Sequence, residues 1–337
     1  MPFFVNFVTL LNCMGNERPS TKNQVLKILR QMAKKEPGTA VSGEDLAEIT
    51  GFSRVSVWKA VQALENSGYQ IESGKNGYRL VHEREDSVMP FEFGENETQV
   101  VFIEETASTM DEARKLAFER MMKPETGDDN EVQGAYGCRA AVLGRKPVIV
   151  TCDRQTNGKD RKGNRWDAKK GSLAFTLVTE VSLPSSKASR MVLAAQVTVA
   201  NTLKALTGKS YKLKWPNEIW DEEGKVGGVL DEVFVSGNRT KWINLGIGIN
   251  IVNKFSRKDF LKTFMTMYKE IENKVVKYPE ILVAEWNYYC SDINKTVRNS
   301  SDGFQGTFIG ADDAGFGLIK NSGGDVMRLT PGESYLL

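Results

Sequence analysis

The chain has 337 residues, which exceeds one small core and predicts two or three domains. Its 40% hydrophobic and 26% charged residues are ordinary for a soluble globular protein. The formal net charge of +2 is too small to attract nucleic acid over the whole surface, so a nucleic-acid site would have to be a local basic patch. The cysteines, Cys13, Cys138, Cys152 and Cys290, form no CxxC pair, which predicts reduced thiols in a cytoplasmic protein. The single histidine, His82, lies in a charged stretch, which argues against a histidine-based triad or metal site.

Residues 1 to 13 form an apolar run that is too short to span a bilayer. The run has no basic start and no small-residue cleavage site, both of which a secretory signal requires. We therefore expect an extension ahead of a true start at Met14, and no membrane segment.

From Ser20 to about Val81 the pattern predicts helix, helix, turn, helix and hairpin. Ser42 begins the second helix, Gly51 ends it, and Ser53 caps the third. The hairpin has a turn-rich, basic tip. This order is the winged helix-turn-helix arrangement, which we predict for residues 20–82.

In such a domain the helix after the turn enters the DNA major groove and the hairpin contacts the backbone. The candidate DNA contacts are Ser53, Arg54, Ser56, Lys59, Lys75 and Arg79. So few basic residues predict weak, salt-dependent binding by a monomer and favour a dimer on two half-sites. The alternative is a small helical module that contacts protein.

The rest of the chain is predicted to be α+β. Glu83 to Glu97 is charged, with little pattern, and is predicted to be a linker. Residues 98–296 mix strands with helices around a mainly antiparallel sheet, with a long surface excursion at 121–147. Residues 300–337 carry short strand-like runs between Gly and Asp turns, which predicts a small SH3-like β-barrel.

Two segments early in the middle domain suggest anion binding. Ser108-Thr109-Met110 lies where a strand gives way to a helix, so hydroxyls and helix N–H groups can bind a polar ligand; ordinary helix capping is the alternative. The loop from Asp153 to Gly171 is rich in glycine and cations, which suits polyphosphate. It is not a P-loop, and an ordinary solvated loop is the alternative.

Two later segments place lysines at strand ends. Lys214 opens the run Lys-Trp-Pro-Asn-Glu, and Lys225 opens the next strand. Gly227 and Gly228 remove side chains, as the close approach of a flat ligand requires. Residues 246–250, Gly-Ile-Gly-Ile-Asn, place two more glycines without side chains on the partner strand. Relief of crowding in a tight hairpin is the alternative.

In this order the segments resemble the biotin protein ligase family. The family's glutamine and GRGRRGRxW loop correspond to Gln155 and residues 158–166, its KWPND to residues 214–218, its lysine-glycine strand to residues 225–228 and its GxGxN to residues 246–250. The winged head and small barrel resemble the bifunctional ligase-repressor subgroup. Five positions depart from the motifs: Lys159, Asp160, Lys162, Asn164 and Glu218. The family's adenine-stacking aromatic has no clear match beyond Phe255.

The resemblance implies an ATP-dependent ligase that makes biotinyl-5'-AMP and then biotinylates a carrier lysine. It implies the catalytic residues Lys225, Arg161 and Glu218, the last as an aid to proton removal from the carrier lysine. It implies the biotin-binding residues Ser108, Thr109, Met110, Gln155, Lys159, Asp160, Arg161, Lys225 and Gly227. It implies the ATP- or adenylate-binding residues Lys159, Arg161, Lys162, Trp166, Lys214, Asn217 and Asn250.

The implied cofactors and substrates are ATP, biotin and Mg²⁺, which arrives with the nucleotide, and no protein metal site is expected. The implied partners are a biotin carboxyl carrier protein domain, operator DNA and a second copy of the chain in the adenylate-bound state. Two alternatives remain: a lipoyl or octanoyl ligase, and a ligand-sensing transcription factor with weak ligase activity.

Overall fold

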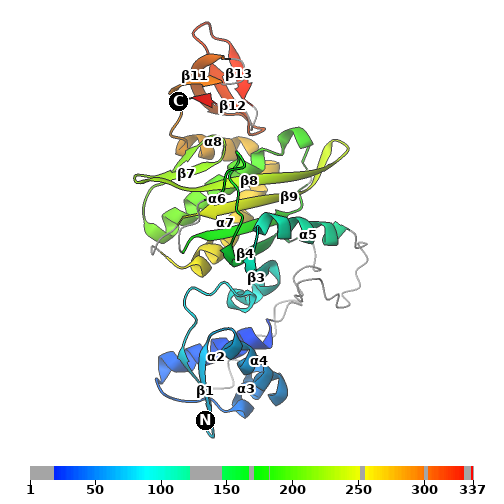
Figure 1. Ribbon diagram of the computed structural model, residues 1–337, viewed down its shortest axis with the longest axis vertical. Helices are drawn as coiled ribbons and strands as arrows, with labels where there is room; N and C mark the ends of the chain where they lie inside the picture. Colours follow the sequence, from blue (N-terminus) through cyan, green and yellow to red (C-terminus); the bar gives the residue numbers. More distant parts are fainter. Residues whose placement is uncertain are drawn as a thin grey trace. The chain divides into compact units, whose positions relative to one another are not determined.

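The computed structural model describes residues 19–121, 146–166, 171–181, 183–250, 255–299, 303–329 and 335–336. The chain divides into two compact units, Met1–Thr98 and Gln99–Leu337, whose helices and strands are labelled in Figure 1. The predicted start at Met14 and nearly all of the predicted excursion at 121–147 lie outside the described residues. Among the described helices, none has the length and apolarity that crossing a membrane requires.

The first unit begins with three helices, α2 (Thr21–Lys35), α3 (Gly43–Thr50) and α4 (Arg54–Asn66). Strands β1 (Gln70–Gly74) and β2 (Gly77–His82) then form an antiparallel hairpin. Each helix begins at a serine whose hydroxyl accepts a backbone N–H, namely Ser20, Ser42 and Ser53. Gly51, with a φ of 65°, ends α3 in the left-handed conformation. This order confirms the predicted winged helix-turn-helix.

The segment that we predicted to be a linker is built into the first unit. Residues Pro90–Gln99 form a kinked 3-10 helix, η1, whose Phe91 is buried in the core of the three helices. The buried Glu92 accepts hydrogen bonds from Arg30 at 2.7 and 2.8 Å and from the hydroxyl of Tyr69. The linker prediction was therefore wrong for these residues, because a few aperiodic aromatic residues give no helix or strand pattern.

A seven-stranded sheet forms the centre of the second unit, with strand order β3-β4-β5-β9-β8-β7-β6. Its strands are β3 (Val100–Thr106), β4 (Val148–Gln155), β5 (Leu173–Thr179), β6 (Lys212–Lys214), β7 (Glu218–Asp221), β8 (Gly224–Ser236) and β9 (Arg239–Ile249). The β3–β4 pair is parallel and the other neighbouring pairs of this sheet are antiparallel, as predicted. Strand β7 was not predicted.

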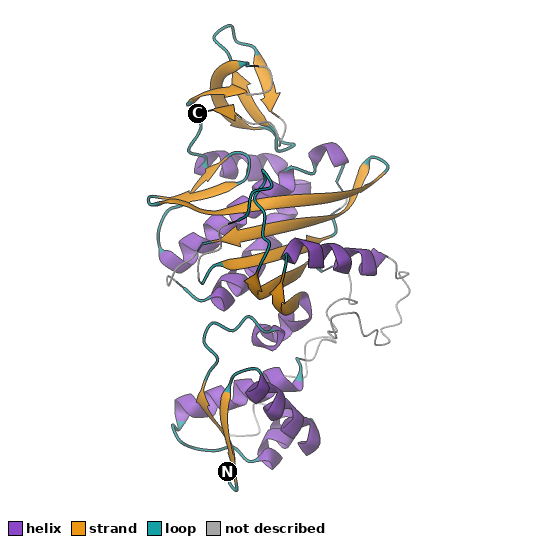
Figure 2. Ribbon diagram, viewed as in Figure 1, coloured by secondary structure: helices purple, strands orange, loops and turns teal. Residues whose placement is uncertain are grey.

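Helices cover both faces of this sheet. Helices α6 (Arg190–Thr207), α7 (Arg257–Lys277) and α8 (Pro279–Tyr289) group together, as Figure 2 shows, with Phe175 of β5 packed on Phe264 of α7. Helix α5 (Thr109–Met121) packs on the other face, where Leu116 joins a core cluster that contains Val178 of β5. Because Phe175 and Val178 differ in parity along one strand, their side chains point to opposite faces.

The chain ends in a five-stranded antiparallel sheet of order β13-β12-β11-β10-β14. Its strands are β10 (Thr296–Asn299), β11 (Gln305–Ala311), β12 (Gly317–Lys320), β13 (Val326–Leu329) and β14 (Tyr335–Leu336). This small antiparallel sheet agrees with the predicted C-terminal barrel. Strands β10 and β14 were not among the predicted runs.

Candidate active site

A cavity of about 640 Å³ opens on the sheet face that α5 also covers. Strand ends, the start of α5 and the loop after β4 all contribute side chains to it. Thirteen of the predicted ligand-binding and catalytic residues line this one cavity: Ser108, Thr109, Met110, Gln155, Lys159, Asp160, Arg161, Lys162, Trp166, Lys214, Asn217, Glu218 and Lys225. The four sequence segments therefore meet at one place.

Two glycines of β9 make room for two of these side chains. A Cβ atom at Gly246 would lie 2.6 Å from Sδ of Met110, and one at Gly248 would lie 2.7 Å from Cζ2 of Trp166. Such distances are too short for real carbon contacts, so Met110 and Trp166 rest directly on the β9 backbone. The Gly-x-Gly spacing thus sets how closely the cavity walls approach the sheet.

A hydrogen-bond network fixes the polar wall beside α5. The side-chain oxygen of Gln155 accepts from the backbone N–H of Thr109 at 2.8 Å and from its hydroxyl at 3.2 Å. Thr176 donates in turn to Oγ1 of Thr109 at 2.9 Å. Because an N–H can only donate, the Gln155 oxygen is fixed on this side, and its amide nitrogen lies over Gly158, where a Cβ would be 2.4 Å away.

The loop after β4 is a closed hairpin between Gly158 and Trp166. The backbone N–H of Trp166 donates to the Gly158 oxygen at 2.8 Å, and the N–H of Asp160 donates to the Asn164 oxygen at 2.8 Å. The Asp160 carboxylate accepts from the N–H groups of Lys162 and Asn164, both at 2.8 Å. The positions Lys169 and Lys170 of the predicted basic loop lie outside the described residues.

Lys225 and Glu218 form an ion pair at the rim, with Nζ of Lys225 2.6 Å from Oε1 of Glu218. The other Glu218 oxygen accepts from the Trp220 indole at 2.9 Å, and the Lys214 ammonium lies 3.7 Å from the Trp220 ring centre. Burial alone would raise the pKa of Glu218. The hydrogen bonds from Lys225 and Trp220, with the charges of Lys225 and Lys214, outweigh burial and lower the pKa of this carboxyl.

The C-terminal sheet supports the wall that follows β6. The Trp215 indole donates to the backbone oxygen of Gly315 at 3.3 Å, and a Cβ at Gly317 would lie 3.0 Å from the Trp215 ring. Nearby, Nε of Arg190 in α6 donates to the backbone oxygen of Asp313 at 2.5 Å. The loop between β11 and β12 is therefore fixed both to α6 and to the cavity wall.

The candidate DNA contacts of the first unit have different surroundings. Ser53 is occupied in capping α4, where its hydroxyl accepts from the Ser56 N–H at 3.1 Å and lies 2.9 Å from the Ser56 hydroxyl. Arg79 on the hairpin forms an ion pair with Glu72. Arg54, Lys59 and, at the hairpin tip, Lys75 are exposed.

Comparisons with known proteins fit this division of the chain. Residues 144–250 match the model of the biotin/lipoate A/B protein ligase family, and residues 23–79 match an HTH domain. The matched middle range contains β4, the basic loop and the strands that carry the paired glycines.

Residues 144–250 thus form a domain similar to the biotin/lipoate A/B protein ligase family, here called the ligase-family domain.

Curated relatives of the chain are named as biotin ligases, and some of them also as repressors. The bifunctional ligase/repressor BirA of Bacillus subtilis is 24% identical over 324 residues, covering 84% of this chain and 90% of that protein. The human biotin–protein ligase is 27% identical over 221 residues, covering 56% of this chain and 30% of that protein. The fold is similar to that of the Aquifex aeolicus biotin protein ligase solved with biotin and ATP, with a TM-score of 0.50, 22% identity, and coverage of 71% of this chain and 98% of that one.

Two predicted residues of the ligase-family domain do not line the cavity. A Cβ at Gly227 would lie 2.7 Å from the backbone oxygen of Gly248, so Gly227 permits close strand packing instead. Oδ1 of Asn250 accepts from the Ser172 hydroxyl at 2.7 Å, which ties β9 to the start of β5. Phe255 packs on Phe260, 5.7 Å between ring centres, and is also absent from the lining.

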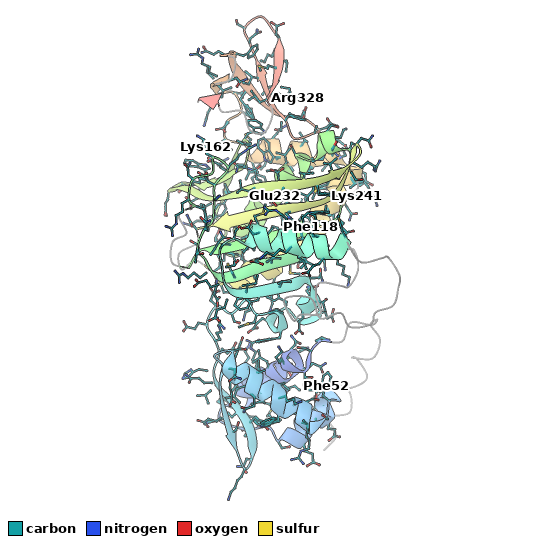
Figure 3. All side chains as sticks on the ribbon, turned by 45° about the vertical axis from the view of Figure 1, so that its right-hand side comes forward. Phe52, Phe118, Lys162, Glu232, Lys241 and Arg328 are labelled. Carbon is teal, nitrogen blue, oxygen red and sulfur yellow. The ribbon has the colours of Figure 1, made fainter. Side chains whose placement is uncertain are left out.

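The cavity also has lining residues that the sequence did not indicate. Ala174 and Leu230 give the ligase-family domain an apolar floor, and Ile247 of β9 also borders the cavity. Their alternation along β5, β8 and β9 is that of any half-buried strand, so no signal separates them from core residues. Asp292, which follows α8, lines the cavity as a fully buried carboxylate and has no motif around it. In Figure 3, Lys162 of the basic loop and Lys241 of β9 lie toward opposite ends of the seven-stranded sheet.

Proposed function

We propose that the chain is an ATP-dependent ligase that converts biotin to biotinyl-5'-AMP and transfers the biotinyl group to a lysine of a biotin carboxyl carrier protein. The observation that carries this proposal is that Lys225, Arg161 and Gln155 line one cavity. Its volume of about 640 Å³ is in the range of small-molecule sites. Four lysines and Arg161 offset the charge of a carboxylate and a phosphate there.

The chemistry needs no nucleophile from the protein. A free carboxylate is a poor acyl donor, because attack must expel oxide, whereas the mixed anhydride with AMP expels a stable phosphate. Catalysis then depends on holding the two substrates in line and stabilising the charge that develops. This agrees with a chain that has a single histidine outside the cavity.

Each wall of the cavity has a proposed task. Thr109 and Gln155, already oriented by their mutual hydrogen bonds, bind the polar ring head of biotin together with Ser108. Lys225 holds the biotin carboxylate and stabilises charge at the reacting carbon. Arg161, with its loop, covers the adenylate. Arg161 lies close enough to Asp231 for their charges to interact, and both residues line a second, smaller pocket.

Glu218 is better suited to hold Lys225 than to remove a proton from the carrier lysine. A lowered pKa makes its carboxylate a weaker base, whereas the unperturbed pKa of a lysine is about 10.4. The Glu218 carboxylate lies 2.6 Å from the Lys225 ammonium and partners its charge. The biotin carboxylate therefore replaces Glu218 as the partner of Lys225 when it binds.

We propose that Mg²⁺ enters with the phosphates of ATP. In the part of the chain that the structure describes, no cluster of three His, Cys, Asp or Glu residues suits a metal ion. A magnesium ion that keeps several waters and binds the triphosphate needs no such cluster. No step above depends on a metal held by the protein.

The HTH domain extends the proposal to transcription. We propose that the chain acts in the cytoplasm and represses its operator as a homodimer when the adenylate is bound. Dimerisation doubles the contacts that the few basic residues of one HTH domain can make. Ligand can shift this equilibrium only by binding the dimer-competent state more tightly.

ATP–pyrophosphate exchange measured with biotin or with lipoate tests the ligase proposal. Exchange that depends on biotin, followed by a biotinyl mass increase on a carrier domain, is the expected result. Exchange with lipoate alone would identify a lipoyl ligase. Binding of biotin without any exchange would leave a ligand-sensing transcription factor.

A further inference from the structure

Helix α4 exposes two large apolar side chains on its outer face. Val55 is 61% exposed and Trp58 is 52% exposed, and no other tryptophan in the described residues is as open to solvent. The inner face of the same helix is buried through Val57, Val61 and Leu64. The outward position of Val55 and Trp58 is therefore fixed by the packing of the helix and not by a shift in its register.

The charges around these two side chains are positive. Arg54 and Lys59 are exposed on the first two turns of α4, and there is no acidic residue in the first turn. The one acidic residue of the helix, Glu65, lies at its far end, where it accepts from Gln62 at 2.8 Å. An apolar patch between cations at a helix N-terminus is complementary to a polyanion that also carries apolar groups.

DNA in its major groove is such a polyanion. The thymine C5 methyl is the apolar group among the base edges that the major groove presents. Helix α4 follows the turn after α3 in the segment that matches an HTH domain, and in that motif the N-terminal residues of this helix reach the base edges. The hydroxyls of Ser53 and Ser56 already hydrogen-bond within the helix cap.

We propose that Val55 and Trp58 are the specificity-determining residues of the HTH domain, and that they select duplexes with thymine methyl groups under the first two turns of α4. Arg54 and Lys59 bind the flanking phosphates without regard to sequence. The inference rests on the proposed DNA binding and adds to it the base chemistry that is recognised. Burying one methyl contributes about 0.8 kcal/mol, or about fourfold in affinity.

The test begins with the full-length chain, biotin and ATP, and a library of random DNA duplexes from which bound members are selected. In the selected duplex each thymine is then replaced singly by deoxyuridine, which removes only the methyl group. Fluorescence anisotropy of the labelled duplex gives the dissociation constants. At one or more positions the wild-type chain should bind about fourfold more weakly.

Variants link that loss to the two side chains. Val55→Ala and Trp58→Ala should weaken binding to the thymine duplex and remove the further loss caused by deoxyuridine. Lys59→Ala should weaken both duplexes equally and reduce the salt dependence, as loss of one phosphate contact does. Val81→Ala, which truncates an exposed valine at the base of the hairpin, is the matched control and should bind as the wild type does.

Four results would overturn the inference. The inference is rejected if deoxyuridine has no effect on affinity at any position. It is also rejected if both Val55→Ala and Trp58→Ala bind with wild-type affinity, and either result leaves DNA binding in place. Weaker dimerisation of Trp58→Ala in sedimentation, with unchanged methyl dependence, would assign the patch to a protein interface. Failure to enrich any duplex would reject the proposed DNA binding itself and the inference with it.

Discussion

Asp160 and Asn164 hydrogen-bond to each other across the basic loop, with Nδ2 of Asn164 donating to Oδ2 of Asp160 at 3.1 Å. Both positions depart from the motif that the loop resembles, Asp160 where the motif has glycine and Asn164 where it has arginine. The Asp160 carboxylate accepts two backbone N–H groups as well, so both departures contribute to one set of hydrogen bonds. The loop is thereby held closed by its own residues.

Asp160→Gly should loosen this loop without unfolding the sheet. The variant loses the acceptor for the N–H groups of Lys162 and Asn164, so hydrogen exchange at these two amides should be faster. Exchange measured by mass spectrometry in the absence of ligand checks this. Lys162→Ala keeps its backbone N–H and is the control. Equal protection in wild type and Asp160→Gly would contradict a closing role for the carboxylate.

Lys225→Ala should nearly abolish biotin transfer, because it removes the ammonium that we assign to the biotin carboxylate. We expect a loss of at least about 100-fold in rate, as for other groups that stabilise developing charge. Thermal unfolding should change little, since the side chain is 42% exposed. Lys241→Ala, at the other end of the sheet, should keep the wild-type rate (Figure 3). An unchanged rate in Lys225→Ala would reject the assigned role.

Glu218→Gln should bind biotin more tightly than the wild type, because the competing carboxylate is lost from Lys225 while the size of the side chain is kept. An ion pair exposed to this degree contributes up to about 1 kcal/mol, so the dissociation constant should fall by up to about fivefold. Isothermal titration measures it. Weaker binding would show that Glu218 positions Lys225 for the ligand and does not compete with it.

The same carboxyl predicts a pH dependence of folding. Because the pKa of Glu218 is lower in the folded chain, its ion pair stabilises the fold above the ordinary glutamate value of about 4.3 and loses that effect as pH falls through the folded-state pKa. The difference between the free energies of unfolding of wild type and Glu218→Gln should therefore be smaller at pH 3 than at pH 7. Denaturant titrations at both pH values test this, and a constant difference would contradict it.

Gly248→Ala should displace the Trp166 ring and so weaken ligand binding. The added Cβ would lie 2.7 Å from Cζ2 of Trp166, and the ring has to move because the β9 backbone cannot. We expect the dissociation constant of biotin to rise about tenfold, which corresponds to about 1.4 kcal/mol. Tryptophan fluorescence, compared with that of a Trp166→Phe variant, reports the displacement of the Trp166 ring. Gly74→Ala, at a position where nothing lies within 4 Å of the added Cβ, is the control and should leave the dissociation constant of biotin unchanged.

Regular elements with strong periodicity could be predicted from the sequence. Serine caps and Gly51 located the helices of the first unit. Short elements were missed because their stability comes from neighbours. Strand β7 has four residues and exists through pairing with β6 and β8, and η1 is held by Phe91 in the core of another segment.

The cavity was predictable where motifs carry charge or glycine, and less so where geometry decides. The sequence indicated Lys225 and Glu218 separately, but their 2.6 Å ion pair depends on the register of β7 with β8. It also assigned Gly227 to the ligand, whereas the β8–β9 register turns this glycine toward Gly248. Which of two adjacent glycines faces a ligand depends on strand parity, which motif spacing alone leaves open.

The hydrogen bond from the Trp215 indole to Gly315 joins the C-terminal sheet to the rest of the second unit, so the sequences of these two parts have to change together. A chimera that exchanged residues 303–337 for those of a relative would have to bring glycine at positions 315 and 317, or the new side chains would collide with Ser189 and Trp215. Recombination and domain shuffling at the β10 boundary are therefore restricted to donors with the same two glycines.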